Sequence, residues 1–289
     1  MRISWLVLLG VILLAFGSAV AAQSFPATVV DDRGREITLD SDPERIVVVG
    51  AMYAQIVVDL GAADRVVGIA DSPENPPELH EATSVGASFA PSVELILALA
   101  PDLVLGVTDW SGDRETLERV GITVLSTPLV TGVADVLDAI RTLGTAIGQA
   151  TAADEIVCAL AERIVRIEGA AFGATPLRAA FLYMAEADTP PYAAGSGTVE
   201  GELVYRSGNL NVFADVPGFP QVSLESVLER DPQVIFTSPA QVDFILASAS
   251  LATVSALRDR RVVGVNAADA TSTRVAELLR LMVDAPKDV

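Results

Sequence analysis

The chain has 289 residues, of which 51% are hydrophobic, so it can bury a sizeable core in one or two domains. Its formal net charge is −19 and its pI is about 4.3. Such an acidic chain argues against nucleic acid and against an anionic membrane surface as partners. Solubility or adaptation to salt would also explain the acidic surface.

Residues 1–21 are typical of a cleavable secretory signal peptide. Met1-Arg2 is a short basic start, residues 5–16 are an apolar run, and Ala19-Val20-Ala21 fits an A-x-A cleavage site. A retained membrane anchor is the alternative, but the run is short for a span of ~20 residues. We therefore expect export of the remaining chain to the periplasm.

Cysteine usage sets a second limit. Cys158 is the only cysteine, so no intramolecular disulfide can form and no cysteine stands at the cleavage site to carry a lipid anchor. Its apolar neighbours Ile156, Val157 and Leu160 predict that Cys158 lies on a buried helix face and is not a nucleophile.

The chain up to residue 150 alternates strands and helices. A hairpin of strands 28–30 and 36–39 turns at Gly34. The further elements predicted are a strand at 45–49, a helix at 51–60, a strand at 66–69, a Pro-rich loop at 71–77, a strand at 103–107, a helix at 115–120, a strand at 123–125 and a helix at 133–147. This alternation predicts a mostly parallel sheet covered on both faces.

A long helix follows at 152–168, with Ile156, Leu160, Ile164 and Ile167 on one face. The alternation then restarts, with a strand at 178–182, a loop at 186–197 and a helix at 198–206. The segment 211–213 follows, and then come helices at 242–246 and 251–257, a strand at 261–265 and a helix at 274–282. We therefore expect two α/β lobes, residues 22–150 and 173–289, coupled rigidly by the helix at 151–172.

A helix-turn-strand unit occurs once in each of these two regions. The copies run from Ser92 to Leu105 and from Ser223 to Phe236. In each, Ser is placed as helix N-cap, Glu follows two positions later where the helix dipole favours an anion, and Pro precedes a buried strand. The repetition predicts two related lobes, each exposing a glutamate, Glu94 or Glu225, at the start of a helix.

Motifs of common enzymes are absent from the sequence. It lacks GxGxxG after a strand, GxxxxGK[ST], HExxH and GxSxG. His80 is the only histidine, which excludes a multi-histidine metal cage, and its Pro-flanked position predicts a loop residue. Gly195-Ser196-Gly197 before a helix either binds an anion or only caps the helix. We expect no catalysis, no cofactor and no metal site.

Five aromatic residues are placed in loops at the C-terminal ends of strands: Tyr53, Phe89, Trp110, Tyr192 and Phe219. In open α/β sheets these ends form the ligand crevice. Aromatics make up only 5% of the chain, so their gathering predicts a cleft for a large, flat, partly apolar ligand. Alternatively, two or three of them only pack under loops.

Together these segments make the chain similar to the substrate-binding proteins of iron-siderophore, haem and vitamin B12 ABC importers, over nearly all of its length after the signal. The resemblance is carried by Arg45-Ile-Val, Arg65-Val-Val-Gly68, Ser92-Val-Glu94 with Pro101-Asp102, Leu117-Glu-Arg-Val120-Gly121, Ala194-Gly195-Ser-Gly-Thr198, Asn211-Val-Phe213 and Phe219-Pro-Gln-Val-Ser223-Leu-Glu225. It implies a class III periplasmic binding protein, with two Rossmann-like lobes of mostly parallel sheet joined by one long helix, and a ligand between the lobes.

The resemblance also implies partners for particular residues. Glu94 and Glu225 would dock on arginines of a membrane permease, which works with an ATPase. The alternative is that each glutamate only favours its helix dipole, a contribution of ~0.3 to 1 kcal/mol. We expect a monomer that performs no chemistry.

The resemblance to vitamin B12 binders rests on the stretch at Phe219 and on the positions of Trp110 and Tyr192. It departs at Ala87-Ser88-Phe89, where those proteins often carry a tryptophan. The net charge disfavours anionic haem and catecholate siderophores unless an arginine such as Arg114 or Arg206 lines the cleft. Haem would also need an axial ligand, His80 or a tyrosine.

The function predicted is capture of cobalamin, or a related ferric siderophore or haem chelate, for an ABC importer. A secreted α/β hydrolase or chelatase-like enzyme that uses the same cleft is one alternative. A ligand sensor without transport is another.

Overall fold

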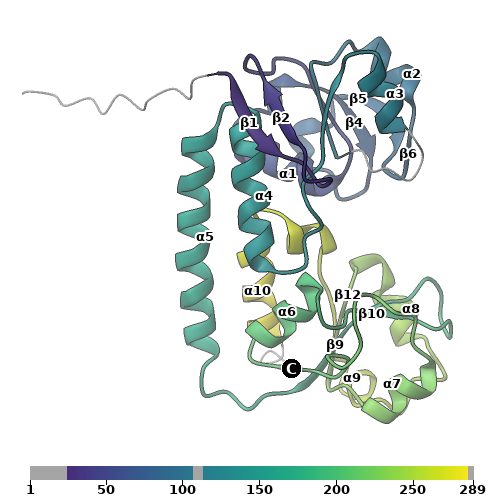
Figure 1. Cartoon of the computed structure of the whole chain (residues 1–289). Coiled ribbons are helices and arrows are strands. Elements are labelled where there is room, and N and C mark those ends of the chain that lie inside the picture. The colour runs from purple at the N-terminus through teal and green to yellow at the C-terminus, as the bar shows by residue number, and fades with distance from the viewer. Residues whose placement is uncertain (1–24, 107–112, 286–289) are drawn as a thin grey trace, which may run out of the picture.

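The computed structural model describes residues 25–106 and 113–285, which contain two larger sheets and a separate two-stranded sheet (Figure 1). In the first, the strands lie in the order β6-β5-β4-β3-β7-β8, and β6 pairs antiparallel with β5 while the other pairs are parallel. The strands are β3 (Ile46–Val48), β4 (Val66–Asp71), β5 (Thr83–Ala87), β6 (Ala90–Pro91), β7 (Leu103–Leu105) and β8 (Thr123–Leu125).

Alternating side chains of these strands point to opposite faces, and each face is covered by helices. Ile46 and Val48 pack with α1 (Ala51–Asp59) and α4 (Val133–Ala146). Val47 and Val49 pack with α2 (Val93–Ala98) and α3 (Asp113–Arg119). The apolar runs of the sequence are therefore strands buried on both faces.

The second sheet has the order β10-β9-β12-β13, with β11 also pairing β9 in parallel. Its strands are β9 (Arg178–Tyr183), β10 (Tyr192–Ala193), β11 (Leu210–Asn211), β12 (Val234–Thr237) and β13 (Val262–Gly264). Its helices are α6 (Val199–Arg206), α7 (Leu224–Arg230), α8 (Val242–Leu246), α9 (Ser255–Arg258) and α10 (Val275–Asp284). Short 3₁₀ turns are η1 (Ala63–Arg65), η2 (Pro77–Leu79), η4 (Pro239–Gln241) and η5 (Ala267–Thr271).

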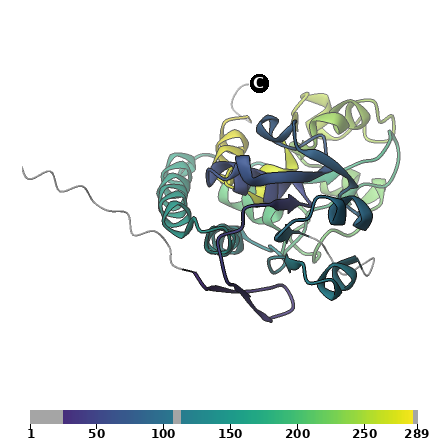
Figure 2. The same ribbon diagram turned by 90° about the horizontal axis from the view of Figure 1, so that it is seen from above.

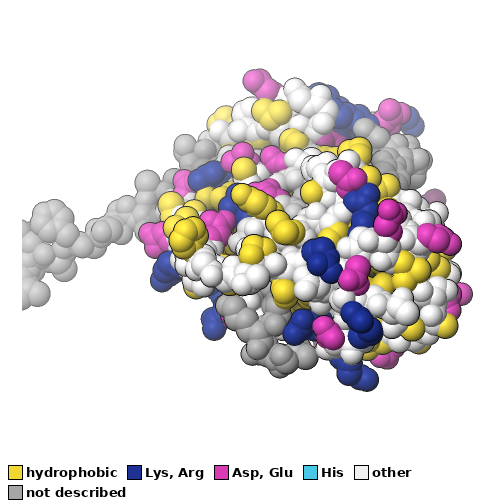
Figure 3. Space-filling view, turned by 90° about the horizontal axis from the view of Figure 1, so that it is seen from below, with side chains coloured by type: hydrophobic (Ala, Val, Ile, Leu, Met, Phe, Trp, Pro, Cys, Tyr) yellow, Lys and Arg dark blue, Asp and Glu magenta, His cyan; other side chains and the backbone are white. Residues whose placement is uncertain are grey.

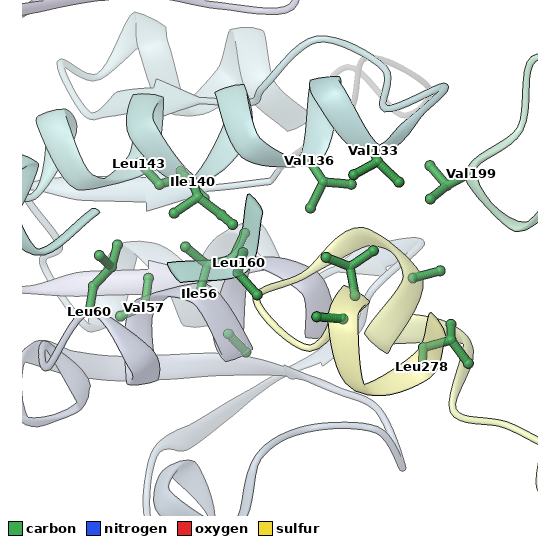
Figure 4. Close-up of a cluster of buried hydrophobic side chains, with 14 of the residues drawn as sticks. Ile56, Val57, Leu60, Val133, Val136, Ile140, Leu143, Leu160, Val199 and Leu278 are labelled. Atoms are coloured by element: carbon green, nitrogen blue, oxygen red, sulfur yellow. The ribbon is translucent and has the colours of Figure 1, made fainter. Parts of the chain in front are cut away.

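One long helix, α5 (Ala150–Ala171), runs alongside both sheets (Figure 1). Leu160 and Ile164 of α5 belong to a core cluster that also contains residues of α4, α6 and α10. Figure 4 shows Val133 and Val136 of α4 directed towards the same apolar space as Val199 and Leu278. The two sheets therefore share one continuous core.

The predicted α/β class is confirmed, and the helix predicted at 151–172 corresponds to α5. The division into lobes at residues 22–150 and 173–289 stays a prediction. Strands β5 and β6 were not predicted, because Thr83–Ala87 consists mostly of small and polar residues without an apolar pattern and the edge strand β6 has only two residues. The helix predicted at 251–257 is wrong over most of its length, since α9 begins only at Ser255.

The prediction that Cys158 is buried is wrong, because its side chain is exposed. The buried face of α5 contains Val157, Leu160 and Ile164. Successive helical residues are about 100° apart, so the position after Val157 is turned away from the core. The apolar residues next to Cys158 in the sequence did not show which side of α5 faces the core.

The antiparallel hairpin of β1 (Ala27–Val30) and β2 (Glu36–Leu39) stands apart from both sheets in the view from above (Figure 2). Arg114 of α3, which is fully buried, attaches it to the first sheet. The Arg114 guanidinium donates to Asp31 Oδ2 at 2.7 Å and to Asp32 Oδ1 at 2.5 Å. Arg35 also pairs with Asp31, at 2.8 Å, and with Glu118, at 2.7 Å.

Replacing Arg114 with methionine is expected to lower the free energy of unfolding by about 3 kcal/mol, because it removes the buried counter-charge of Asp31 and leaves only the more exposed Arg35 to pair with that carboxylate. Denaturation by urea, followed by circular dichroism, measures this loss. Arg141→Met is the matched control, because Arg141 pairs with Asp138 and Asp154 on the exposed surface, where such pairs contribute roughly 0 to 1 kcal/mol. Equal losses for the two variants would contradict the prediction.

Candidate ligand-binding site

The first sheet has its topological switch point between β3 and β7. β4 and β5 lie on one side of β3, whereas β7 and β8 lie on the other. Connections from β3 and β7 therefore leave in opposite directions, and a crevice is expected outside the carboxyl ends of these two strands. Tyr53, in the first turn of α1 directly after β3, lies at this point.

Gly106, which follows β7, provides the space for the Tyr53 ring. A Cβ atom at Gly106 would lie 2.8 Å from the Tyr53 ring and 2.2 Å from the Val49 carbonyl oxygen, and the φ angle of Gly106 is +89°. The Thr127 N–H donates to the Tyr53 hydroxyl at 3.0 Å, and the Thr127 hydroxyl lies 3.1 Å away. Burial raises the pKa of Tyr53. The Tyr53 ring is therefore fixed across the ends of β3, β7 and β8, and its hydroxyl group stays protonated.

The second sheet has an equivalent point at the end of β9. β11 and β10 pair with one side of β9 and β12 with the other. Tyr183 is the last residue of β9, and its hydroxyl donates to Glu200 Oε1 at 3.1 Å. Burial, with the neighbouring Glu200, raises the pKa of Tyr183, and burial also raises the pKa of Glu200. Tyr183 is thus a protonated phenol held by a buried carboxyl group.

Tyr183, Tyr192 and Phe219 form what we call the aromatic cluster. The Phe219 and Tyr183 ring centroids are 5.9 Å apart, and Tyr183 in turn lies 5.2 Å from Phe181 in the core. Tyr192 of β10 is paired in register with Tyr183, so both side chains lie on the same face of the sheet. Tyr192 is 50% exposed and Phe219 is 43% exposed. The cluster therefore exposes the rings of Tyr192 and Phe219 to solvent, while Tyr183 packs against Phe181 of the core.

Sequence reasoning identified Tyr192 and Phe219 but missed Tyr183. The strand was expected to end at residue 182, so Tyr183 was not placed among the loop aromatics. Its position directly after an apolar run was a signal that could have identified it. Strand ends are the least reliable part of such predictions, and here the extra residue is the one at the switch point.

The loop that carries Phe219 is fixed by backbone hydrogen bonds. The N–H groups of Gly195 and Ser196 donate to the carbonyls of Gly218 at 2.9 Å and Val216 at 2.8 Å. A Cβ atom on Gly195 would lie 1.9 Å from the Val216 oxygen, so only glycine allows this approach. Because these two N–H groups are used within the chain, they are not available to bind an anion, and the glycines have a structural role.

Of the other predicted aromatics, Phe89 belongs to the first sheet and not to this cluster. Phe89 is at the tip of the β5–β6 hairpin and is 84% exposed. Trp110 lies outside the described residues. Hollows of about 480 Å³ beside α5 and α6 and about 500 Å³ near His80 contain none of the five predicted aromatics in their walls.

Arg114 and Arg206, which the sequence suggested as cations for an anionic ligand, are both paired with carboxylates of the protein. Arg114 is buried among Asp31, Asp32 and Glu118. Arg206 pairs with Glu168 and, at 2.5 Å, with Glu202. His80 is exposed at the end of η2. Among residues 25–106 and 113–285, no group of three or more His, Cys, Asp or Glu side chains is placed to hold a metal ion.

Polar contacts join the two sheets beside α1 and η5. Glu74, in the loop after β4, lies near the backbone N–H groups of Ala267 and Ala268, so burial raises the pKa of its carboxyl group while these N–H groups lower it. Asp59 of α1 accepts from the Thr273 hydroxyl and lies 3.5 Å from Arg274. These contacts cross between sequence regions about 200 residues apart, so they fix one sheet relative to the other.

Asp269 of η5 makes this junction sensitive to pH. Burial raises the pKa of Asp269 to about 6, against an opposing effect of Arg274 and with support from Glu277 and Glu74. Its pKa in the unfolded chain is near 3.8. The folded chain therefore binds this proton more tightly, and the free energy of unfolding should rise as the pH falls from about 6 towards 4.

Asp269→Asn removes the ionisable group. The variant is expected to exceed the parent protein in free energy of unfolding by about 1 to 2 kcal/mol at pH 7, after allowance for solvent screening, and to match it near pH 4. Urea denaturation across this pH range tests the prediction. The exposed Asp243 offers a control, as Asp243→Asn should leave the difference between pH 7 and pH 4 unchanged. A variant less stable than the parent at pH 7 would refute the assignment.

The two repeated units contain the expected helix starts. The Leu95 N–H donates to Ser92 Oγ at 3.3 Å, and the Ser226 N–H donates to Ser223 Oγ at 3.1 Å. The predicted N-caps are therefore confirmed. Glu94 and Glu225 are both exposed. In Figure 1, α2 and α7 lie at opposite ends of the molecule, on the side away from α5.

Comparison with known proteins gives the family. The sequence profile of the periplasmic binding protein family matches residues 46–268. The chain belongs to this family. A cobalamin-binding protein of Halobacterium salinarum is 32% identical over 235 residues, which cover 79% of this chain and 63% of that protein. The chain thus spans less than two thirds of the length of this relative.

Two further relatives support the assignment to this family. A vitamin B12-binding protein of Vibrio cholerae is 29% identical over 203 residues, covering 68% of this chain and 70% of that protein. The solved structure of an ABC-type Fe³⁺-hydroxamate transport system of Saccharomonospora viridis superposes with a TM-score of 0.77 at 28% identity, covering 91% of this chain and 99% of that one. The chain therefore has the class III periplasmic binding protein fold.

Proposed function

We propose that this protein is the substrate-binding component of an ABC importer, which captures cobalamin or a related metal chelate between two lobes and delivers it to a membrane permease. The observation that carries the proposal is the exposed aromatic cluster of Tyr183, Tyr192 and Phe219 at the switch point of the second sheet, in a chain of this family. Tyr53 occupies the equivalent point of the first sheet. The ligand would lie between these rings, and Phe89 and Trp110 remain in the proposed set of ligand-binding residues.

Cobalamin is the ligand that the surroundings of the cluster favour. Its corrin ring offers an apolar rim that aromatic rings can cover. The tyrosine hydroxyls at both switch points are bonded within the protein and are held protonated, so they are poorly suited to bind ferric iron as phenolates. Arg114 and Arg206, the cations considered for anionic ligands, are paired with carboxylates. Ferric siderophores and haem therefore rank below cobalamin.

The enzyme alternative receives less support. A hydrolase would need a nucleophile beside a base, and His80 is exposed in a loop away from the aromatic cluster. A sensor without transport would have the same ligand site and differ only in its partner. We propose export to the periplasm through the signal at residues 1–21 and action as a monomer. No helix among the described residues is long and apolar enough to cross a membrane.

The identity of the ligand can be measured through Trp110, because the only other tryptophan, Trp5, lies in the predicted signal. In the protein without residues 1–21, we expect saturable quenching of Trp110 fluorescence by cobalamin at sub-micromolar concentration. Phe219→Ala should weaken binding about fivefold, because it removes one stacking face worth roughly 1 kcal/mol. Calorimetry serves as a second readout.

Phe172→Ala is the matched control for this titration. Phe172 is 93% exposed at the end of α5 and is not part of the aromatic cluster, so its loss should leave affinity unchanged. Tight binding of haem or a ferric siderophore, without binding of cobalamin, would replace the ligand assignment. If none of the three binds by either method, the transport proposal itself fails.

The docking roles of the two exposed glutamates are tested by Glu94→Ala combined with Glu225→Ala. The double variant should abolish ligand uptake by cells that express the importer, since each carboxylate would pair with a cation of the permease. Ligand affinity should stay intact, because both side chains lie at the starts of outer helices. Loss of ligand affinity, or uptake at the normal rate, would refute docking through these residues.

A further inference from the structure

The outer surfaces of α2 and α7 differ although the two helix starts are repeats. Alignment of Ser92 with Ser223 pairs each position of α2 with one of α7, namely Glu94 with Glu225, Leu95 with Ser226, Ile96 with Val227, Leu97 with Leu228 and Ala98 with Glu229. Ile96 and Val227 are each fully buried, so both helices have the same inward direction. The remaining positions can therefore be compared one by one.

The rotation of α2 places its single carboxylate between two leucines. Residues along a helix are about 100° apart, so with Ile96 inward, Glu94 and Ala98 point outward and Leu95 and Leu97 lie on the two flanks. Leu95 is 45% exposed and Leu97 is 38% exposed. The Ser92 hydroxyl also lies 3.1 Å from Glu94 Oε2 and holds that carboxylate. The surface at α2 therefore presents one oriented carboxylate, Glu94, with exposed leucines on both sides.

The same positions of α7 are more polar. Glu225 and Glu229 both point outward and are exposed, and the flanks are Ser226 and the half-buried Leu228. The end of the molecule that carries α7 shows acidic, basic and hydrophobic side chains interspersed, without a wide area of one kind (Figure 3). A partner can therefore attach to the α7 end through local charge, whereas the α2 end also offers apolar area.

We infer, building on the proposed docking to a permease, that α2 binds the permease through an apolar contact around one ion pair, while α7 binds it through charge alone. The partner at the α2 end would present a cation bordered by apolar side chains, the complement of Glu94 with Leu95 and Leu97. The partner at the α7 end would present a cationic surface wide enough for Glu225 and Glu229.

Salt separates the two kinds of contact. Exposed ion pairs weaken as the Debye length falls from about 10 Å at 0.1 M salt to about 3 Å at 1 M. Burial of apolar area is not screened in this way. The α2 contact should therefore persist at high salt, and the α7 contact should be lost.

The test measures binding of the full exported protein to the purified permease–ATPase complex of the same importer in lipid nanodiscs, at 0.1 M and 1 M KCl. Leu95→Ser with Leu97→Ser should weaken binding about tenfold at both salt concentrations. Glu225→Ala with Glu229→Ala should weaken binding about tenfold at 0.1 M and have little effect at 1 M. Val165→Ser with Leu281→Ser, on exposed apolar residues of α5 and α10, is the control and should bind normally.

Circular dichroism and cobalamin affinity verify that each variant is folded. The inference is overturned if the leucine variant binds the complex as tightly as the parent protein does. It is also overturned if the leucine variant is weakened at 0.1 M KCl but not at 1 M KCl. It is also overturned if the α7 variant loses as much affinity at 1 M as at 0.1 M. Glu94→Ala with Glu225→Ala separates the two proposals. If this variant binds the complex normally at 0.1 M, the docking proposal fails. If it binds weakly while the leucine variant binds normally, the docking proposal stands and the present inference fails.

Discussion

The apolar core shared by α4, α5, α6 and α10 is the constraint on which the rest of the structure depends. Its side chains come from helices that pack on different sheets, yet they form one cluster. Separating the sheets would expose this apolar area to water, at roughly 25 cal/mol for each Å². The relative orientation of the sheets is therefore set by packing, with polar contacts at Glu74 and Asp59 beside it.

A fixed frame has consequences for ligand recognition. Each sheet places a tyrosine at its switch point, and the surrounding chain uses the hydroxyl in both cases, through Thr127 for Tyr53 and through Glu200 for Tyr183. In the proposed mode of binding, the rings are oriented before the ligand arrives, so little conformational entropy is lost. Recognition by oriented rings suits a large rigid ligand and needs no nearby cation.

Several arginines are neutralised by ion pairs within the protein. Arg114, Arg206 and Arg230 each pair with carboxylates, which tie a hairpin, a helix end and a loop in place. Exposed Glu94 and Glu225 stand outside these networks, at the starts of two outer helices. In a chain with a net charge of −19, a partner would distinguish them by their geometry and apolar surroundings more than by the sign of their charge.

The sequence alone determined the α/β class, the order of most helices and strands and the two N-capped helix starts, because periodicity and capping are local properties. It also predicted that Tyr192 and Phe219 lie in loops at strand ends, but the structure has only Phe219 in a loop, whereas Tyr192 belongs to strand β10. It could not reveal Tyr183, whose importance depends on which strands flank β9, nor the exposure of Cys158, which depends on the rotation of α5 against the core. The pairing of Arg114 with Asp31 and the approach of Glu74 to Ala268 join residues far apart in the chain, and only tertiary packing decides such contacts.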